Sequence, residues 1–424
     1  MSMEYVIIGN SAAAVAAVEG IRKNDKDGNI TLISDERHHT YSRPLISYYL
    51  GDKVKTEGMY YRDQDFYIKN NVKAILGKKA VEIKQEQKKV VLENGEQVAY
   101  DKLLIATGSV PFVPPMEGLE NKENIFTFLK WDDSITLKDK VNKDSKVVII
   151  GAGLIGLKAA EGLNKLCDDV TVVELADRVL STILDNQAAG IVQRHMEHKG
   201  TKFILNNTVS KICGEGKVEK VVLKDGTELP CDILVVAIGV RPNVALAQTA
   251  GVQVHRGIMV DSRMETSVED IYAAGDVTES MDITVNTNRI LALWPNAYYQ
   301  GEIAGCNMSG GTMQFNGAFP MNAIGFFGLP MITAGIVNPV GDQYSIYMEY
   351  NEDEEWLKKF VVKGDVLVGF ILLNKVDRAG IYTSLIRDKV PLKMIKHDLL
   401  EDGFGLKAFP KSIRKEKMLM GGKE

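Results

Sequence analysis

Hydrophobic and polar positions near the start of the chain form blocks that predict a strand, a helix and a second strand. A short apolar run occupies residues 5–8, Ala-rich sequence with helical spacing follows at 11–22, and another apolar run lies at 30–33. A strand, a helix and a strand in this order are typical of a βαβ unit with parallel strands. We interpret this region as half of a nucleotide-binding fold.

The same order of blocks returns roughly 140 residues later, which indicates an internally duplicated architecture. The second set of blocks lies at 146–150, 154–166 and 170–173. The Pro-containing segment 111–115 and the charged stretch 121–146 are predicted to carry the chain from the first unit to the second, and 238–243 to carry it back. The second unit is therefore predicted to be inserted in the first.

From about residue 318 the pattern changes to alternating strands, which predicts a separate α+β module. Its strands are expected at 344–350, 357–362 and 366–373, and a short helix at 380–387. The predicted fold class is α/β, with two Rossmann-like three-layer domains and a C-terminal α+β domain. The expected boundaries are 1–115 with 242–317 for the first domain, 116–241 for the second and 318–424 for the third.

Composition and charge exclude several classes of protein. The 424 residues are 45% hydrophobic and 25% charged, and the net charge of -5 gives no reason to expect a nucleic acid or a membrane as partner. No apolar run of about 18 residues and no signal-peptide pattern is seen, so we expect a cytoplasmic protein. The cysteines lie too far apart in sequence for a typical metal or redox motif, and we expect free thiols and no metal site: Cys167, Cys213, Cys231 and Cys306.

The turn after the first strand, Gly9 to Ala14, is a degenerate form of the GxGxxG dinucleotide fingerprint. The fingerprint needs small residues where the backbone approaches a pyrophosphate at a helix N-terminus. Taken alone, the turn fits a helix packed closely on a sheet equally well. Asp35 and Glu36 follow the second predicted strand, where an acidic residue reaches an adenosine ribose. The sequence leaves open which of the two does so.

The turn after the strand at 146–150 carries the complete fingerprint, with glycines at Gly151, Gly153 and Gly156. Glu174 follows the next strand and is placed to accept hydrogen bonds from ribose hydroxyls while repelling a 2′-phosphate. The second unit is therefore predicted to prefer NADH over NADPH. Arg178 lies close enough in sequence to weaken this preference.

Three further segments, 104–108, 238–243 and 266–276, complete a pattern that resembles the pyridine nucleotide-disulfide oxidoreductase family of two-dinucleotide flavoproteins. The resemblance covers almost the whole chain and implies FAD in the first unit and NAD(H) in the second. It implies that Asp276 binds the ribityl chain of FAD and that a helix at 295–305 points its N-terminus at the flavin. Arg43, Pro44, Trp294 and Pro295 become candidates for contact with the flavin, and no catalytic acid or base is assigned.

The resemblance implies two sets of cofactor-binding residues. The FAD set is Gly9, Ser11, Ala12, Ala13, Ala14, Asp35, Glu36, Arg43, Pro44, Ala80, Val81, Ala106, Thr107, Gly108, Gly275, Asp276 and Pro295. The NAD set is Gly151, Gly153, Leu154, Ile155, Gly156, Glu174, Ile238 and Gly239.

The family's redox cysteine is missing, since no cysteine precedes Cys167. The stretch 38–48 instead resembles the subgroup of NADH:rubredoxin oxidoreductases and the flavin-binding part of assimilatory nitrite reductases. This implies that electrons pass directly between the flavin and a small iron-sulfur protein, rubredoxin-like or ferredoxin-like. Two alternatives stay open: an NADH oxidase or peroxidase that uses bare flavin and oxygen, and a redox-quiet flavoprotein that serves as a binding subunit. His38 and His39 are expected to be solvated.

The nicotinamide contact departs from the family, which often has an aromatic residue at Leu154 and a glutamate at Lys158. Glu161, one helical turn on, is an alternative partner for the carboxamide. The Lys-rich segment 411–417 is either a docking site for an acidic redox protein or, with more weight, a solvated tail. The direction of electron flow and the existence of a homo-oligomer stay open.

Overall fold

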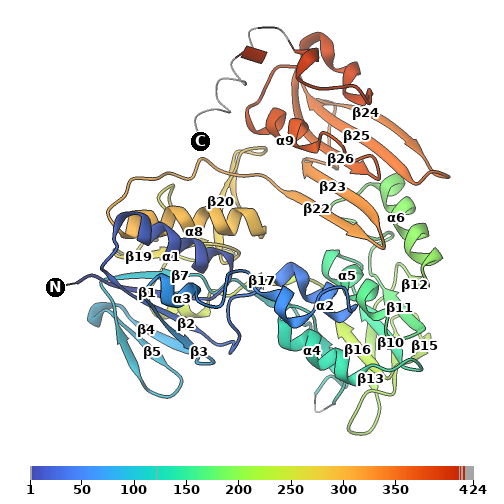
Figure 1. Cartoon of the computed structure of the whole chain (residues 1–424). Helices are drawn as coiled ribbons and strands as arrows, with labels where there is room; N and C mark the ends of the chain where they lie inside the picture. The colour runs from blue at the N-terminus through green and yellow to red at the C-terminus, as the bar shows by residue number, and fades with distance from the viewer. Residues whose placement is uncertain (1, 121, 410, 412–413, 416–424) are drawn as a thin grey trace.

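The fold of this chain, seen here in a computed structural model, consists of two nucleotide-binding units and a C-terminal sheet module (Figure 1). The structure describes residues 2–120, 122–409, 411 and 414–415. Most of the Lys-rich segment 411–417 therefore lies outside the described residues. Within the described part, no helix has the length and hydropathy needed to cross a membrane.

The first unit contains a five-stranded parallel sheet with strand order β19-β7-β1-β2-β3. Its strands are β1 (Glu4–Ile8), β2 (Asn29–Ser34), β3 (Val72–Leu76), β7 (Lys102–Ile105) and β19 (Ile271–Ala273). Strands β1 and β7 are buried almost throughout, as expected for a parallel sheet covered on both faces. The predicted first βαβ unit is thus present.

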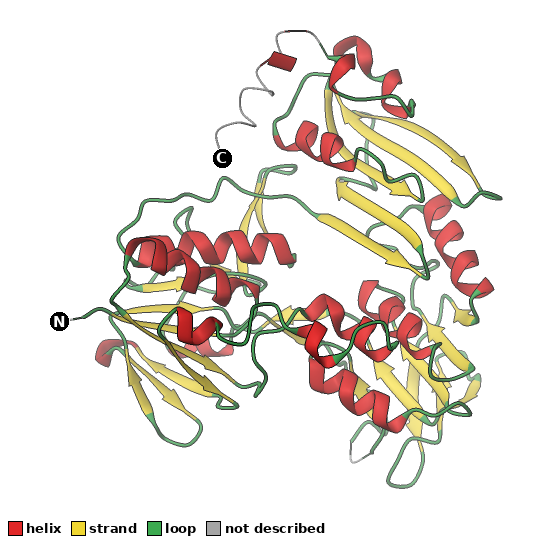
Figure 2. Ribbon diagram, viewed as in Figure 1, coloured by secondary structure: helices red, strands yellow, loops and turns green. Residues whose placement is uncertain are grey.

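Two helices, α1 (Ala12–Asn24) and α8 (Trp294–Met308), pack against each other on the first sheet (Figure 2). Glycines on α8 permit the close approach: a Cβ at Gly301 would lie 2.1 Å from the carbonyl oxygen of Ala13, and one at Gly305 would lie 2.2 Å from that of Ala17. Any larger side chain would force the helices apart. The small residues of α1 therefore serve helix packing as well as the turn before it.

The second unit repeats this plan with strand order β12-β11-β10-β16-β9, again parallel. Its strands are β9 (Ile125–Thr127), β10 (Lys146–Ile150), β11 (Asp169–Val173), β12 (Thr201–Ile204) and β16 (Ile233–Val236), and its helices are α4 (Trp131–Lys140), α5 (Leu154–Leu163) and α6 (Asn186–His198). The stretch 121–146 was predicted to be only a crossing between units. It contributes β9, which closes the edge of the sheet beside β16, and α4, so that prediction was incomplete.

The two crossings between the units lie side by side, because β8 (Ser109–Pro111) pairs antiparallel with β17 (Val240–Pro242). Each unit also carries a three-stranded antiparallel sheet. These are β4 (Ala80–Lys84), β5 (Lys89–Leu92) and β6 (Gln97–Ala99) in the first, and β13 (Val209–Cys213), β14 (Lys220–Leu223) and β15 (Glu228–Pro230) in the second. The remaining elements are α2 (Ile46–Leu50), α3 (Phe66–Lys69), α7 (Ala245–Thr249), β18 (Ile258–Met259), β20 (Thr278–Asp282) and β21 (Thr287–Ile290).

The C-terminal module is an antiparallel sheet of order β22-β23-β26-β25-β24. Its elements are β22 (Met321–Phe326), β23 (Leu329–Gly335), β24 (Tyr344–Asn351), β25 (Trp356–Lys363), β26 (Val366–Leu373) and α9 (Ala379–Arg387). Figure 1 shows this module above the second unit, near α6. The sheet is fixed there by a hydrogen-bonded ion pair of 2.7 Å between Lys359 and Asp185, the N-cap residue of α6.

Candidate functional site

A cavity of about 830 Å³ opens where the two units and the C-terminal module meet. Its walls come from the turn between β1 and α1, the segment around α2, the start of α5, and Ala323 and Ile324 of β22. A volume of this size suits a large, mostly enclosed ligand. The two dinucleotide fingerprints and the third module therefore contribute to one space.

Most residues predicted for the first nucleotide line this cavity. They are Gly9, Ser11, Ala12, Ala13, Asp35, Glu36, Arg43, Pro44, Ala80, Val81, Ala106, Thr107, Gly108, Gly275, Asp276 and Trp294. Two predicted residues do not line it. Ala14 is fully buried in α1, and Pro295 in the first turn of α8 is exposed, while Ala297 of the same helix lines the cavity.

The turn at Gly9 requires glycine, because its backbone takes a positive φ and packs closely against Ala106. Gly9 has a φ of +132°, and a Cβ there would lie 2.2 Å from the carbonyl oxygen of Ala106. Ser11 occupies the N-cap position of α1 without a side-chain capping bond, so its hydroxyl is free of that contact. Helix N-terminal amides, small side chains and a hydroxyl at the cavity wall fit a dinucleotide pyrophosphate.

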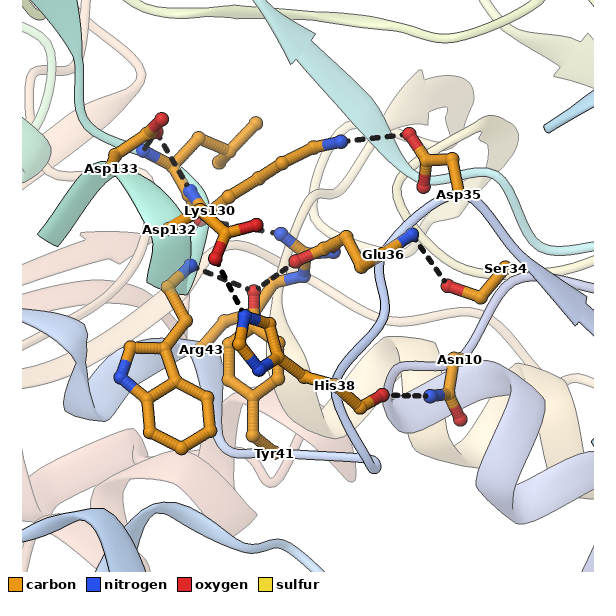
Figure 3. Close-up of polar contacts among 12 residues, drawn as sticks. Asn10, Ser34, Asp35, Glu36, His38, Tyr41, Arg43, Lys130, Asp132 and Asp133 are labelled. Atoms are coloured by element: carbon orange, nitrogen blue, oxygen red, sulfur yellow. Dashed lines mark hydrogen bonds and ion pairs between the residues drawn. The ribbon is translucent and has the colours of Figure 1, made fainter. Parts of the chain in front are cut away.

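The structure separates the roles of the two adjacent carboxylates. Glu36 is buried, accepts a 2.7 Å hydrogen bond from the hydroxyl of Tyr41 and pairs with the guanidinium of Arg43 (Figure 3). Asp35 is exposed and meets the ammonium group of Lys130 at 2.7 Å. Asp35 has one recorded partner and Glu36 has two, so Asp35 keeps more acceptor capacity for a ribose.

A segment of the second unit covers this part of the cavity, a feature that was not predicted from the sequence. Phe128, Leu129 and Lys130 line the cavity from the stretch between β9 and α4. Arg43 donates to the carbonyl oxygen of Leu129 at 3.2 Å, and the backbone N–H of Trp131 donates to the Tyr41 hydroxyl at 3.1 Å. These contacts join residues far apart in sequence, so the prediction of a simple crossing did not include them.

The two histidines of the 38–48 segment are not solvated as predicted. The Nε2 atom of His38 lies 2.7 Å from Asp132, and its ring centre lies 4.7 Å from that of Trp131. His39 is half-buried and packs edge to face on Tyr67 at 4.7 Å. Both rings are held against aromatic neighbours, which explains why they do not extend into solvent.

Asp276 faces the cavity next to the crossing strand β8. Its carboxylate accepts a 3.2 Å hydrogen bond from the hydroxyl of Ser109. Burial raises the pKa of Asp276 above its ordinary value, and Ser109 and Arg43 act against this increase. A ligand that brings hydroxyl donors to this carboxylate would stabilise its ionised form, as a ribityl chain does.

Leu154 and Ile155, the residues predicted to form an apolar nicotinamide slot, lie at the start of α5 and line the cavity with Lys158. Glu161, the alternative partner for a carboxamide, does not line it. Its carboxylate is 4% exposed and is bound by Lys158, by Lys53 and by the backbone N–H of Phe327. Glu161 is therefore held away from the cavity wall by three donors, which does not favour it as the carboxamide partner.

The other residues predicted for the second nucleotide lie outside the cavity, directly after neighbouring parallel strands. Gly151, Glu174 and Ile238 follow β10, β11 and β16, Gly153 and Gly239 lie in the same turns, and Gly156 lies in the first turn of α5. In open α/β sheets the carboxyl ends of the strands form the ligand crevice. These residues therefore share one edge of the second sheet.

The second turn has the geometry of a phosphate cradle. A Cβ at Gly151 would lie 2.5 Å from the carbonyl oxygen of Ala237, while a Cβ at Gly153 would meet nothing within 4 Å. Gly153 thus leaves open space at the N-terminus of α5, which a larger side chain would fill. Glu174 accepts hydrogen bonds from the backbone N–H groups of Ala152 at 2.6 Å and Ala176 at 2.8 Å, which fixes its carboxylate beside the turn.

The cysteines are separated from the cavity, as none of its described lining residues is a cysteine. All four thiols are free, and burial raises the pKa of Cys167 to about 11 and that of Cys231 to about 12. Such thiols are poor nucleophiles at neutral pH. Among the described residues, no group of histidine, cysteine and acidic side chains is arranged to hold a metal ion.

Comparison with known proteins extends these observations. Residues 3–301 match the family model described as pyridine nucleotide-disulphide oxidoreductase. The chain is 31% identical over 397 residues to the NADH-dependent phenylglyoxylate dehydrogenase subunit epsilon of Aromatoleum evansii, covering 93% of both chains. It is 32% identical over 310 residues to a rubredoxin-NAD(+) reductase of Pseudomonas putida, covering 73% of this chain and 80% of that protein.

Solved structures share the architecture. A ferredoxin reductase from Rhodopseudomonas palustris superposes with a TM-score of 0.80 at 27% identity, covering 88% of this chain and 91% of that one. Because the two nucleotide-binding units end near residue 317, a coverage of 88% includes part of the C-terminal module.

Proposed function

The chain belongs to the pyridine nucleotide-disulphide oxidoreductase family, and from this premise we propose that it exchanges electrons between NADH and a small iron-sulfur protein through a bound FAD. The printed names of two relatives support the class of partner, because one is a rubredoxin-NAD(+) reductase and another a ferredoxin reductase. A bound FAD supplies the chemistry that joins a two-electron donor to a one-electron acceptor.

In this proposal the first unit holds FAD. The turn from Gly9 to Ala13 binds the pyrophosphate, Asp35 binds the adenosine ribose, and Asp276 binds the ribityl chain. Arg43, held by Glu36 and by the Leu129 carbonyl, keeps a positive charge at the cavity wall. Its pKa stays above the ordinary arginine value, because the influence of Tyr41 and Glu36 outweighs burial.

The second unit holds NADH. Gly151, Gly153 and Gly156 form the phosphate turn, and Glu174 binds the ribose. Leu154 and Ile155 extend from this turn into the cavity and exclude water where the nicotinamide is placed. The protein contributes alignment of the two rings, and the residues described here provide no acid or base for the transfer.

The observation that carries the proposal is the separation of every thiol from a cavity shared by both fingerprints. Family chemistry that uses a disulfide needs a thiol at the flavin. Without one, electrons must leave the flavin directly for the acceptor. The four free thiols also favour a reducing compartment, and we place the protein in the cytoplasm.

Anaerobic titration with NADH tests this. We expect one equivalent of NADH per FAD to bleach the flavin completely, with no further uptake, because the flavin is the only centre that takes up electrons in the proposal. Uptake of a second equivalent would reveal another redox centre and contradict the proposed route. Absence of bleaching would leave the redox-quiet binding subunit as the remaining alternative.

A further inference from the structure

A lysine is buried in the cavity wall at the point where the three parts of the chain meet. Lys158 lies on α5, one turn after Leu154, and is 8% exposed. It lines the cavity with Tyr48 of α2 and Ile324 of β22. Removing a lysine from water is costly, so its place on a largely apolar wall requires a compensating interaction.

The ammonium group of Lys158 contacts a different segment in each of three directions. Its Nζ atom donates a 3.1 Å hydrogen bond to the carbonyl oxygen of Gly325, pairs with the carboxylate of Glu161 and lies 4.4 Å from the ring centre of Tyr48. A carbonyl and an aromatic face stabilise a cation without neutralising it. Within the described part of the chain, Glu161 is the carboxylate recorded at ion-pair distance.

Glu161 must serve a second lysine as well. Its Oε1 atom accepts a 2.7 Å hydrogen bond from the ammonium group of Lys53 and another from the backbone N–H of Phe327. One carboxylate therefore faces two ammonium groups, and the cluster keeps a net positive charge. The side chain of Lys53 is 40% exposed and that of Lys158 is 10% exposed. Because Glu161 divides its charge between the exposed Lys53 and the buried Lys158, it neutralises Lys158 only in part, and positive charge remains at the cavity wall.

We propose that the positive charge of Lys158 stabilises the negative charge that the flavin gains when it accepts a hydride. Lys158 would therefore raise the reduction potential of bound FAD. Hydride transfer balances: NADH becomes NAD⁺ by losing two electrons and one proton, and the flavin gains all three with one net negative charge. The inference rests on the proposed function, since it needs a flavin beside Leu154 and Lys158. It adds a determinant of potential that lies on the second unit rather than on the first.

The test measures the midpoint potential of the FAD-loaded protein by slow enzymatic reduction against a reference dye, without NADH. Lys158→Met removes the charge and keeps much of the side-chain volume, Lys158→Gln keeps a donor, and Lys158→Arg keeps the charge. Lys53→Met is the matched control, because it removes the exposed lysine of the same cluster. Flavin absorbance and thermal unfolding establish that each variant is loaded and folded.

We expect both neutral variants to weaken the stabilisation of reduced relative to oxidised flavin about tenfold, which is about 30 mV for a two-electron couple. Lys158→Arg should keep most of the potential, and Lys53→Met should change it much less. The inference would be overturned if the potentials of loaded Lys158→Met and Lys158→Gln equalled that of the wild type, or if Lys53→Met shifted the potential equally. Either result would leave the proposed function standing. Wild-type protein whose flavin NADH fails to reduce would overturn the proposed function and the inference with it.

Discussion

At the scale of single residues, the proposed preference for NADH over NADPH rests on Glu174. Glu174 is fixed beside the phosphate turn by two backbone N–H groups. Arg178, which in the sequence weakened the expected preference for NADH, is occupied elsewhere. Its guanidinium lies 2.7 Å from Asp177 and donates to the backbone oxygens of Ser181 and Leu184. In the proposed function, Arg178 therefore does not offset the repulsion between the Glu174 carboxylate and a 2′-phosphate.

We predict that Glu174→Ala raises the ratio of kcat/KM for NADPH to that for NADH about tenfold, because the repulsion is removed. Steady-state kinetics with both nucleotides measure the ratio. Asp169→Ala, at the opposite end of β11, is the control and should leave it unchanged. If the Glu174 variant kept the discrimination of the wild type, the assignment of the ribose carboxylate would be wrong.

Two glycines of the first unit are required for different physical reasons, a close backbone contact at one and only a positive φ at the other. Gly9→Ala should abolish FAD retention, since the new Cβ would collide with the Ala106 carbonyl at 2.2 Å in a backbone with φ of +132°. Gly95→Ala, outside the cavity lining, meets no atom within 4 Å and bears only the strain of φ +84°, roughly 1 kcal/mol. Flavin content after purification and thermal unfolding distinguish the two. Equal behaviour of both variants would contradict the role given to the turn.

At the scale of elements, the short segment between β9 and α4 closes the first unit's cofactor site from the second unit. Its Lys130 pairs with Asp35, and its backbone binds Tyr41 and Arg43. These contacts tie the two units together across the cavity (Figure 3). We therefore expect loss of these contacts to weaken cofactor binding more than it destabilises the fold of the first unit.

We predict that Lys130→Ala weakens FAD binding about three- to tenfold, mainly through faster dissociation, because the ion pair it removes is partly exposed. Lys140→Ala, an exposed lysine at the end of the same helix α4, should have no effect. Fluorescence of released flavin after dilution reports the rate. If the Lys130 variant released flavin no faster than the control, the segment between β9 and α4 would not contribute to FAD retention.

The sequence allowed prediction of those elements whose signal is local. Gly151 to Gly156 lies in a strand, turn and helix that the apolar pattern identifies by itself, and Asp276 ends a motif of the same kind. The contacts of Lys158 were not predictable, because Tyr48 and Gly325 are brought to it only by tertiary packing. The choice between Asp35 and Glu36 also needed the positions of Tyr41 and Lys130.

At the scale of the whole molecule, Glu161 joins all three parts, since it binds Lys53 of the first unit, Lys158 of the second and Phe327 of the C-terminal module. Burial acts to raise the pKa of Glu161, but the hydrogen bonds from Lys158 and Lys53 hold it below the ordinary value. A lowered pKa means that the stabilisation is complete above the unfolded-state value of about 4.3 and is lost as pH falls through the folded-state value.

Glu161→Gln should therefore unfold at a lower temperature than the wild type at pH 7, and the difference should shrink as pH is lowered below about 4.5. Thermal unfolding across this range measures it. Glu197→Gln, on the exposed face of α6, provides a carboxylate control with no such dependence. A difference that stayed constant with pH would mean that Glu161 contributes through packing rather than charge.

At the scale of the whole molecule, the proposed function requires the flavin to take electrons from NADH and to pass them to a protein partner. Anaerobic stopped-flow spectroscopy tests this most directly, by mixing NADH-reduced protein with an oxidised rubredoxin or ferredoxin and, separately, with dioxygen. We expect the iron-sulfur protein to reoxidise the flavin much faster than dioxygen at equal concentration. Faster reoxidation by dioxygen than by every iron-sulfur protein tried would contradict the account and favour an NADH oxidase.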